Sequence, residues 1–377
     1  MDRGQGLLGK DGVTSWLTDR IDRLRGRGQY SPTVPPMDGA LRPNTYLDRA
    51  TELLRLDAPD NLTMHRGGLL MSSGRNLLKV DVADRAVSVW RTFDAGISAL
   101  ASRDGTLAVA LEDGRLIAGL ESGPEIETRL PAPWDACGAS ALAFTGAATL
   151  AVCIGSSANR PEEWRRDLME RRICGSVWTV SLSDKAARAV AQDLAYPCGV
   201  VGVGDSLVVS EAWRHRLVRL GSGAPVPVLA HLPGYPSRLI PARAGGHWLC
   251  VFAPRSQLVE FVLRQRAYCE RMMSEVEPDY WVAPSLKPAT HFLEPIQGGA
   301  IRVHGAIKSW APTRSYGLLA RLDEAFRPVA SFHSRADGTY HGVTSVAELG
   351  ARILVASKGG GVLLDAPPGL VEGEAFA

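Results

Sequence analysis

Short apolar strands recur along this chain, each after a turn built from small, polar, glycine or proline residues, and this repeat constrains the fold most. The first apolar residues of the six strands are Leu62, Ile97, Ala139, Val200, Leu239 and Val343. Three of the steps, from 62 to 97, from 97 to 139 and from 200 to 239, are 35, 42 and 39 residues long, which suits one four-stranded blade each. The repeat therefore predicts an all-β six-bladed β-propeller, with its site where the six turns converge.

Two longer steps, of 61 residues from 139 to 200 and of 104 residues from 239 to 343, predict insertions at about 156–173 and 255–313. In the first insertion, Pro161–Arg172 begins with proline and acidic residues and ends with basic residues, an order that suits a helix dipole. In the second, the apolar residues from Leu258 to Val276 predict a helix with a broad apolar face, and later prolines predict an irregular path. The longer insertion is either a lid over the channel or packing on the rim.

The two ends of the chain predict an arm and a closing strand. Thr14–Arg25 has helical spacing and precedes a proline-rich stretch, so residues 1–50 read as a helical arm on the main body, or as a partly disordered tail. The propeller then takes residues 51–377. In the last blade we expect strands at 316–323, 329–332, 343–346, 353–357 and 361–365, and Glu52–Leu56 supplies the missing outer strand.

Composition excludes several classes of protein. The net charge is +2, which gives no sign of a nucleic-acid partner. The first residues lack the basic-then-apolar pattern of a secretory leader, and no apolar run reaches about 18 residues, so we expect no transmembrane segment. The six cysteines are scattered without a Cys-x-x-Cys pair, which favours free thiols and a cytoplasmic location.

Three segments in order along the chain carry a family resemblance: Leu194–Leu217, which contains Tyr-Pro-Cys-Gly-Val and Ser-Glu-Ala-Trp, Leu232–Leu249, and Tyr316–Ser357. Together they resemble the strictosidine synthase-like branch of the SMP-30/gluconolactonase/LRE-like superfamily, over roughly residues 50–367. The resemblance implies a six-bladed propeller. It also implies one of several activities, since the family includes calcium-dependent lactonases and arylesterases and a metal-independent Pictet–Spengler condensing enzyme.

The same resemblance places the family's calcium ligands at Asp60, Cys198 and Ser237. Only Asp60 brings a carboxylate, and a thiol is a poor ligand for a hard cation. Arg238 adds positive charge where the metal would lie, so we expect no cofactor, with calcium kept as an alternative. Arg238 then either replaces the cation, with Asp60 as its counter-ion, and orients a ligand carboxylate or carbonyl, or forms a simple salt bridge that fills the channel.

Two further residues are candidates for chemistry. Cys198 is a nucleophile if Arg238 or His341 lowers the pKa of its thiol, or else a small buried residue. His341, in the turn before the sixth blade, is a general acid or base at the channel mouth, or a hydrogen-bonded structural residue. Residues 340–345 contain no carboxylate, which argues against the condensing enzyme's mechanism, since the resemblance places a catalytic Glu there.

Three functions remain open. The first is an enzyme acting on a small organic substrate at the channel mouth, by lactone or ester hydrolysis or by condensation or cyclisation. The second is a small-ligand-binding protein without turnover. The third is a scaffold on a membrane surface or protein partner, through 255–313 or through the N-terminal helix. The candidate catalytic residues are His341, Cys198 and Arg238. The candidate substrate-binding residues are Asp60, Asn61, Ser237, Tyr235, Tyr340 and Cys137. We also interpret Trp213–Arg216 as a strand that directs Arg214 and Arg216 to one side.

Overall fold

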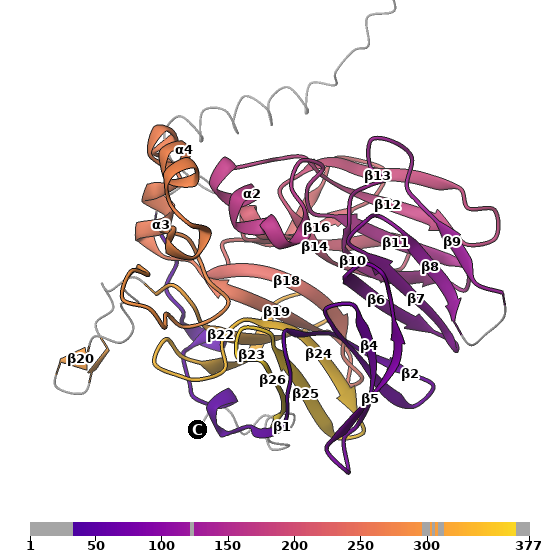
Figure 1. Ribbon diagram of the computed structural model, residues 1–377, viewed down its shortest axis with the longest axis horizontal. Coiled ribbons are helices and arrows are strands. Elements are labelled where there is room, and N and C mark those ends of the chain that lie inside the picture. The colour runs from indigo at the N-terminus through magenta and orange to yellow at the C-terminus, as the bar shows by residue number, and fades with distance from the viewer. Residues whose placement is uncertain (1–32, 121–123, 296–301, 304–305, 308–312, 367–377) are drawn as a thin grey trace, which may run out of the picture.

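The computed structural model describes residues 33–120, 124–295, 302–303, 306–307 and 313–366. The helix expected at 14–25 and part of the second insertion lie outside these residues. The described chain forms six four-stranded antiparallel sheets arranged around a central axis (Figure 1). This confirms the prediction of an all-β six-bladed propeller.

Each blade runs outward from a first strand at the channel. Blades one to three are β2 (Pro59–His65), β3 (Gly68–Ser73), β4 (Asn76–Asp81) and β5 (Ala86–Thr92); β6 (Ile97–Arg103), β7 (Thr106–Leu111), β8 (Leu116–Leu120) and β9 (Ile126–Thr128); and β10 (Ala139–Gly146), β11 (Thr149–Ile154), β12 (Gly175–Ser181) and β13 (Ala187–Leu194). Blades four to six are β14 (Pro197–Val203), β15 (Ser206–Glu211), β16 (Arg216–Leu220) and β17 (Val226–Leu229); β18 (Gly234–Pro241), β19 (His247–Pro254), β22 (Gly317–Leu322) and β23 (Pro328–Ser334); and β24 (Val343–Leu349), β25 (Arg352–Ser357), β26 (Val362–Ala366) and β1 (Thr51–Arg55). All six strands predicted from the repeat are the first strands of blades.

The ring closes as predicted, because β1 pairs antiparallel with β26 and completes the sixth blade. The expected membership of the last blade was wrong in one respect. The strands at 317–322 and 328–334 belong to blade five, where β22 pairs with β19. The second insertion separates β19 from β22, so the outer half of blade five follows it in sequence.

Both insertions leave the propeller between the second and third strands of a blade. The first, in blade three, contains the 3-10 turn η4 (Pro161–Glu163) and α2 (Trp164–Glu170). The second, in blade five, contains α3 (Gln257–Val262), α4 (Arg266–Glu275), the 3-10 turn η6 (Pro278–Tyr280) and the short strands β20 (Arg302–Val303) and β21 (Ala306–Ile307). Figure 1 shows α2 close to α3 and α4 at one side of the ring.

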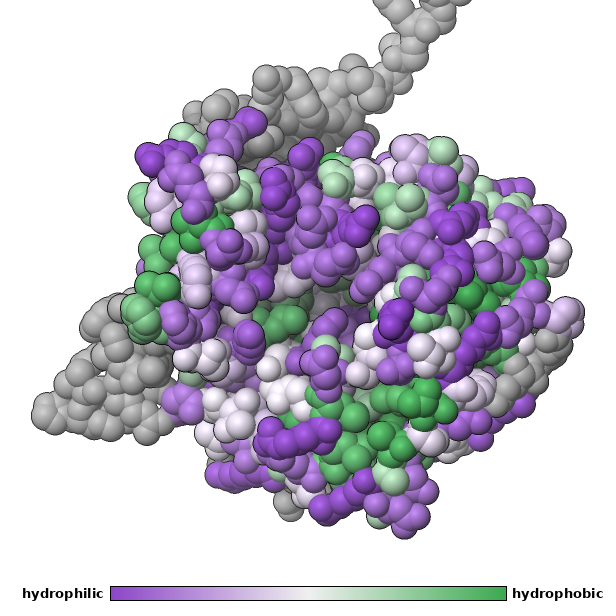
Figure 2. Space-filling view, in the orientation of Figure 1, coloured by the Kyte–Doolittle hydropathy of each residue, from purple (hydrophilic) through white to green (hydrophobic). Residues whose placement is uncertain are grey.

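The single helix expected from Leu258 to Val276 is instead two helices. The backbone leaves the helical region at Gln265, whose φ is −92° and ψ is 75°. The chain bends here so that Val259, Val262, Cys269 and Met272 pack in one buried cluster. Leu258 and Phe261 remain exposed on α3, where Figure 2 shows hydrophobic surface at the edge of the molecule.

The segment before β1 packs on the outside of blade five. It contains two 3-10 turns, η2 (Gly39–Leu41) and η3 (Leu47–Arg49). The Asn44 amide donates to the Ser331 carbonyl at 2.8 Å, and the Ser334 hydroxyl donates to Asp48 at 2.7 Å. These contacts attach the start of the described chain to β23.

The six cysteines are all free thiols, as predicted. No helix within the described residues is both long enough and apolar enough to cross a membrane. The core lies between neighbouring blades, where small and branched apolar side chains such as Val109, Val152 and Val209 are fully buried. This packing sets the six first strands side by side and leaves a channel along the axis.

Candidate functional site

Arg238 divides the central channel into two cavities. The front cavity, about 320 Å³, lies at the end where the first strands begin, and both insertions contribute to its wall. The rear cavity, about 740 Å³, lies at the other end, and the strands and the turns that follow them line it. Both cavities include Arg238 in their lining. Figure 2 shows the molecule hollowed near its centre, where the blades converge.

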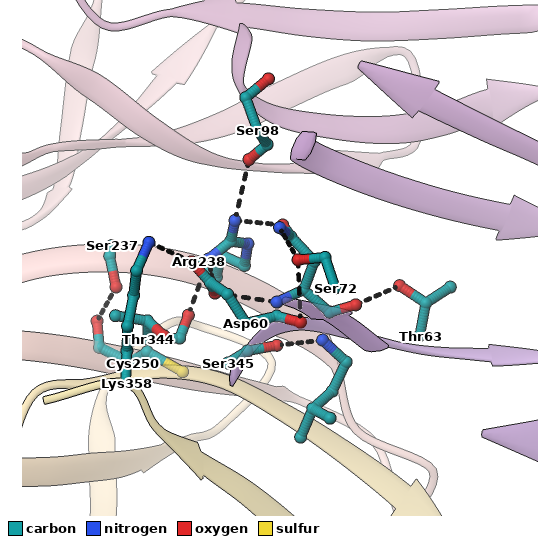
Figure 3. Close-up of polar contacts among 12 residues, drawn as sticks. Asp60, Thr63, Ser72, Ser98, Ser237, Arg238, Cys250, Thr344, Ser345 and Lys358 are labelled. Carbon is teal, nitrogen blue, oxygen red and sulfur yellow. Dashed lines mark hydrogen bonds and ion pairs between the residues drawn. The ribbon is translucent and has the colours of Figure 1, made fainter. Parts of the chain in front are cut away.

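The Arg238 guanidinium joins three blades by hydrogen bonds (Figure 3). Nη1 donates to Asp60 Oδ1 at 2.6 Å and to the Thr344 carbonyl at 3.0 Å. Nη2 donates to the Ser98 carbonyl at 3.3 Å and to the side-chain oxygen of Asn61. Arg238 therefore forms the expected ion pair with Asp60, and it also binds blades one, two and six to its own blade, blade five.

Asp60 is a buried carboxylate held between two cations. Its second oxygen lies 3.1 Å from Lys358 Nζ. Burial alone would raise the pKa of Asp60, but the charges of Arg238 and Lys358 and the backbone N–H of Asn61 outweigh it and hold the pKa at about 2. Asp60 is thus ionised at neutral pH and serves as a counter-ion.

Asn61 has the backbone conformation that turns the chain beside Asp60. Its φ is 56°, in the left-handed region that Asn tolerates better than most residues. Its N–H donates to Asp60 Oδ1 at 2.8 Å, and its side-chain amide donates to Ser72 Oγ at 2.8 Å. The local turn therefore aims both side-chain oxygens, of Asp60 and of Asn61, at the guanidinium.

This arrangement does not fit a calcium ion. The oxygens that a hard cation would use, from Asp60, Asn61 and the carbonyls of Ser98 and Thr344, already accept hydrogen bonds from Arg238. A metal in their midst would meet the repulsion of the guanidinium at close range. Among the described residues, no group of three or more His, Cys, Asp or Glu side chains could hold a metal ion.

Glu112 is a half-buried acid in the front cavity that sequence reasoning missed. It follows β7, and its carboxyl forms no hydrogen bond or ion pair with the described residues. Burial raises its pKa, and the nearby Glu162 raises it further, against the weaker opposing charges of Lys358 and Arg160. A Cβ on residue 96 would lie 2.2 Å from Glu112 Oε2, so Gly96 provides the space that this carboxyl occupies.

Aromatic side chains form the wall opposite the charged floor. Trp164, at the start of α2, packs edge to face on Phe252 with ring centroids 5.2 Å apart. Both residues line the front cavity together with Tyr196 and with Leu286 of the second insertion. The front cavity thus combines apolar side chains from the insertions (Trp164 and Leu286) and from the blades with acid, ammonium and hydroxyl groups from the blades.

Two hydroxyl groups in the lining of the front cavity have no hydrogen-bond partner among the residues that the structure describes. The Ser98 and Thr344 side-chain oxygens are buried and form no hydrogen bond within the described chain. The backbone carbonyls of the same two residues accept from Arg238. Arg238 therefore holds in place the two residues whose hydroxyls are unpaired. A buried hydroxyl without a hydrogen-bond partner lowers the stability of the fold by about 1 to 3 kcal/mol.

Of the residues predicted from sequence, Asp60, Cys198, Ser237 and Arg238 line the front cavity. The Cys198 thiol does not have the character of a nucleophile. It donates to the Pro236 carbonyl at 3.1 Å, and burial raises its pKa to about 12, despite Ser210 and Arg238, which lower it. Ser237 donates its hydroxyl to the Cys250 carbonyl at 3.2 Å. Both side chains are engaged in structural contacts.

His341 does not reach the front cavity, contrary to the expectation that it faces the channel mouth. Its side chain is fully buried. Nε2 donates to the Arg335 carbonyl at 2.7 Å, and Nδ1 accepts from the Ser315 hydroxyl at 2.8 Å. Burial lowers its pKa. The imidazole is neutral with both nitrogens used, which matches the alternative of a hydrogen-bonded structural residue.

The other predicted binding residues lie elsewhere. Tyr235 is fully buried in the cluster under α3 and α4. Tyr340 donates its hydroxyl to Glu52 at 2.8 Å, on the outer side of blade six. Cys137 packs at the edge of the blade-three core, and Asn61 lines the rear cavity. The expected strand at Trp213–Arg216 is instead a 3-10 turn, η5 (Ala212–Arg214), with His215 in the left-handed region at φ 50°.

One signal could have identified Glu112 and Lys358 from the sequence. Each directly follows the second strand of its blade, and its N–H donates at 2.9 Å to the carbonyl of the glycine before the first strand, Gly96 or Gly342. The pairing of first and second strands therefore brings this position to the front cavity. Sequence reasoning followed the first strands alone and so missed the residue opposite them.

Comparison with known proteins shows the fold. No family model matches the chain, and no curated protein matches it. Among solved structures, the calcium-binding protein regucalcin from Agrobacterium tumefaciens is similar at 13% identity and a TM-score of 0.52, over 84% of this chain and 91% of that one. A gluconolactonase from Xanthomonas campestris is similar at 13% identity and a TM-score of 0.51, over 86% of this chain and 92% of that one. At such identities the likeness establishes a shared propeller architecture.

Proposed function

We propose that this propeller is a hydrolase that opens a small lactone or ester in the front cavity. The observation that carries the proposal is Glu112, an acid with a raised pKa in a cavity that also holds the Lys358 ammonium. A carboxyl group of this kind can act as a general base or acid near neutral pH. The fold likeness to a gluconolactonase is consistent with this class of reaction.

In the proposed reaction, Glu112 accepts a proton from a water molecule as the water oxygen attacks the substrate carbonyl carbon. The negative charge that develops on the carbonyl oxygen is stabilised by Lys358, with the Ser98 and Thr344 hydroxyls as further donors. The carbon–oxygen bond to the leaving group then breaks, and Glu112 returns the proton to the leaving alkoxide. Arg238 is a positioning residue that holds the donors in place.

The cavity also limits the substrate. A volume of about 320 Å³ lies at the lower end of the range for small-molecule sites. Trp164, Tyr196 and Phe252 supply apolar surface on one side. The proposed substrate is therefore a compact organic lactone or ester with an apolar or aromatic portion. The stated resemblance to the strictosidine synthase-like branch, and with it a condensation or cyclisation, stays a prediction.

The proposal is tested by a screen of small lactones and aryl esters with the purified chain and two matched variants. Glu112→Gln removes the base, and we expect a loss of about 10²- to 10⁴-fold in kcat/KM. Glu127→Gln makes the same change on the exposed outer strand β9 of the same blade and should retain the parent rate. Equal turnover by both variants would contradict the role of Glu112.

A second measurement separates catalysis from binding. The compound recovered after incubation is identified by mass spectrometry. A hydrolysed product that depends on Glu112 supports the enzyme. A ligand that binds in the front cavity and is recovered intact, from the parent chain and from Glu112→Gln alike, would overturn the hydrolase and favour the small-ligand-binding alternative.

A further inference from the structure

A third cavity lies where the two insertions meet, and arginine side chains surround it. This arginine cavity, about 70 Å³, is lined by Arg171 and Arg172 at the end of α2, Arg214 in η5 and Arg264 after α3. Its floor consists of buried residues, among them Leu168, Ala195 and Leu263. It shares no lining residue with the front cavity, so it is a separate site.

Among the described residues, the charged groups that line the arginine cavity are mostly cations. Glu260 is the only carboxylate among the described lining residues, and this group already lies 3.0 Å from Arg255 and 3.3 Å from His215. Arg172 pairs with Glu170 at 2.8 Å, and Arg214 lies 3.4 Å from Glu211. Arg264 forms no ion pair with any described residue, so it brings a positive charge that no carboxylate in the described part of the chain pairs with.

One of the lining side chains also has an unused donor among the described residues. Arg214 Nε is buried and has no hydrogen-bond partner within the described chain. The side chain of Arg214 is 21% exposed, so most of it is removed from water. A buried N–H of a guanidinium group without a partner is costly, and an anion in the cavity would satisfy it.

We propose that the arginine cavity binds a small oxyanion of the phosphate class. Planar guanidinium groups recognise phosphate oxygens through paired hydrogen bonds. The cavity has room for a group of a few heavy atoms and not for a larger ligand. The shared chemistry is a phosphate group, either free or at the end of a small metabolite.

The arginine cavity lies between the two insertions, so a bound anion would connect them. Arg171 and Arg172 belong to the first insertion, and Arg264 belongs to the second. Trp213 already connects the first insertion to blade four, since its Nε1 donates to Asp167 of α2 at 2.7 Å. A bound anion would connect α2 to the α3–α4 segment as well, and α2 begins at Trp164, which lines the front cavity.

The test is thermal unfolding of the full chain in increasing inorganic phosphate, against sodium chloride at matched ionic strength. We expect a saturable rise of the Tm in phosphate, because a ligand that binds only the folded state stabilises it. Arg264→Gln should weaken phosphate binding roughly 10-fold or more, as expected for a lost charge-assisted hydrogen bond. Arg266→Gln, two residues away at a side chain that is 91% exposed, is the matched control and should bind as the parent does.

Two outcomes would overturn the proposal. One is a Tm that changes no more in phosphate than in chloride. The other is an equal loss of binding in Arg264→Gln and Arg266→Gln. Isothermal titration with inorganic phosphate and with glycerol phosphate distinguishes the two sources, since tighter binding of glycerol phosphate identifies a terminal phosphate group, and tighter binding of inorganic phosphate identifies a free anion.

Discussion

The two ends of the channel are built from the same six first strands, yet they differ in chemistry. The front cavity is small and contains Glu112, Lys358 and Asp60 beside aromatic side chains. The rear cavity is larger, and the middle and end of each first strand line it, with apolar residues such as Leu62, Leu100, Leu142, Val200 and Leu239. None of the described residues of the two insertions lines the rear cavity.

The difference follows from where each residue lies on its strand. Residues at the front belong to the beginnings of the first strands, to the second strands and the residues directly after them, and to the insertions. Side chains in the insertions and in the connections between strands vary without disturbing blade packing. Residues at the rear lie within or just after the strands, where side chains alternate between the channel and the neighbouring sheet. Function in this chain is therefore expected at the front, and Arg238 marks the boundary.

The largest effect on stability is expected for Arg238→Ala. The substitution leaves the buried Asp60 without its closest cation and removes the bonds that join four blades. Breaking a buried pair in this way costs about 3 to 5 kcal/mol. Urea unfolding measures the change in the free energy of unfolding.

Arg103→Ala is the matched control at the rear. Arg103 lines the rear cavity and lies 3.3 Å from Asp104, whose side chain is 79% exposed. Exposed pairs contribute about 0 to 1 kcal/mol, so this variant should unfold nearly as the parent does. A similar loss in the free energy of unfolding in both variants would show that Arg238 contributes no more to stability than a charged residue at the rear of the channel.

The next effect is a dependence of stability on acid pH through Asp60. Its pKa is about 2 in the folded chain and about 3.8 ordinarily, so the folded state favours the ionised form. This contribution is fully present above pH ~4 and is lost as the pH falls toward ~2, with a total of about 2 kcal/mol.

The measurement is the free energy of unfolding from pH 5 to pH 2 for the parent and for Asp60→Asn. The variant lacks the titrating group, so its stability should fall less steeply with acid. Glu260, whose pKa is also lowered to about 2, titrates in both proteins and cancels in the comparison. Parallel curves would contradict the ion-pair role of Asp60.

The sequence predicted some parts of this arrangement and not others, because only some parts produce a recognisable pattern in the sequence. The six blades and the closing strand follow from a regular repeat. The Asp60–Arg238 pair follows from the family resemblance, which places Asp60 and the neighbour of Arg238 at the channel mouth. His341 was placed wrongly because the turn before a first strand has inward and outward positions. The hydrogen bonds to Ser315 and Arg335 decide its position, and they involve residues far apart in sequence.

The residues that the sequence did not identify depend on pairing between strands. Glu112 and Lys358 reach the front cavity because of the register between the first and second strands, which a repeat spacing leaves undetermined. The aromatic wall brings Trp164 of the first insertion together with Phe252 of β19 and Tyr196 before β14, which are far apart in sequence. The division of 258–276 into α3 and α4 likewise depends on packing against the blades, which helical spacing alone does not contain.

A smaller effect is expected for Lys358→Met. The side chain of Lys358 is 37% exposed, and its pair with Asp60 is partly screened by solvent, so the loss of stability should be at most about 1 kcal/mol. Activity should fall more, by roughly 10-fold or more, if Lys358 stabilises the developing oxyanion. Lys185→Met, in an exposed turn of blade three, is the control, and an unchanged kcat in Lys358→Met would remove that role.

The smallest effect is expected when the same substitution, phenylalanine to leucine, is made once in each cavity. Phe252→Leu removes aromatic surface from the front cavity, and Phe144→Leu does so in the rear cavity. Such swaps usually cost less than about 1.5 kcal/mol of stability. An aromatic contact contributes about 0.5 to 1.5 kcal/mol, so KM for a lactone or ester with an aromatic group should rise about 2- to 10-fold in Phe252→Leu. The rear variant should leave KM unchanged, and a rise of KM in Phe144→Leu alone would place the substrate behind Arg238 rather than in front of it.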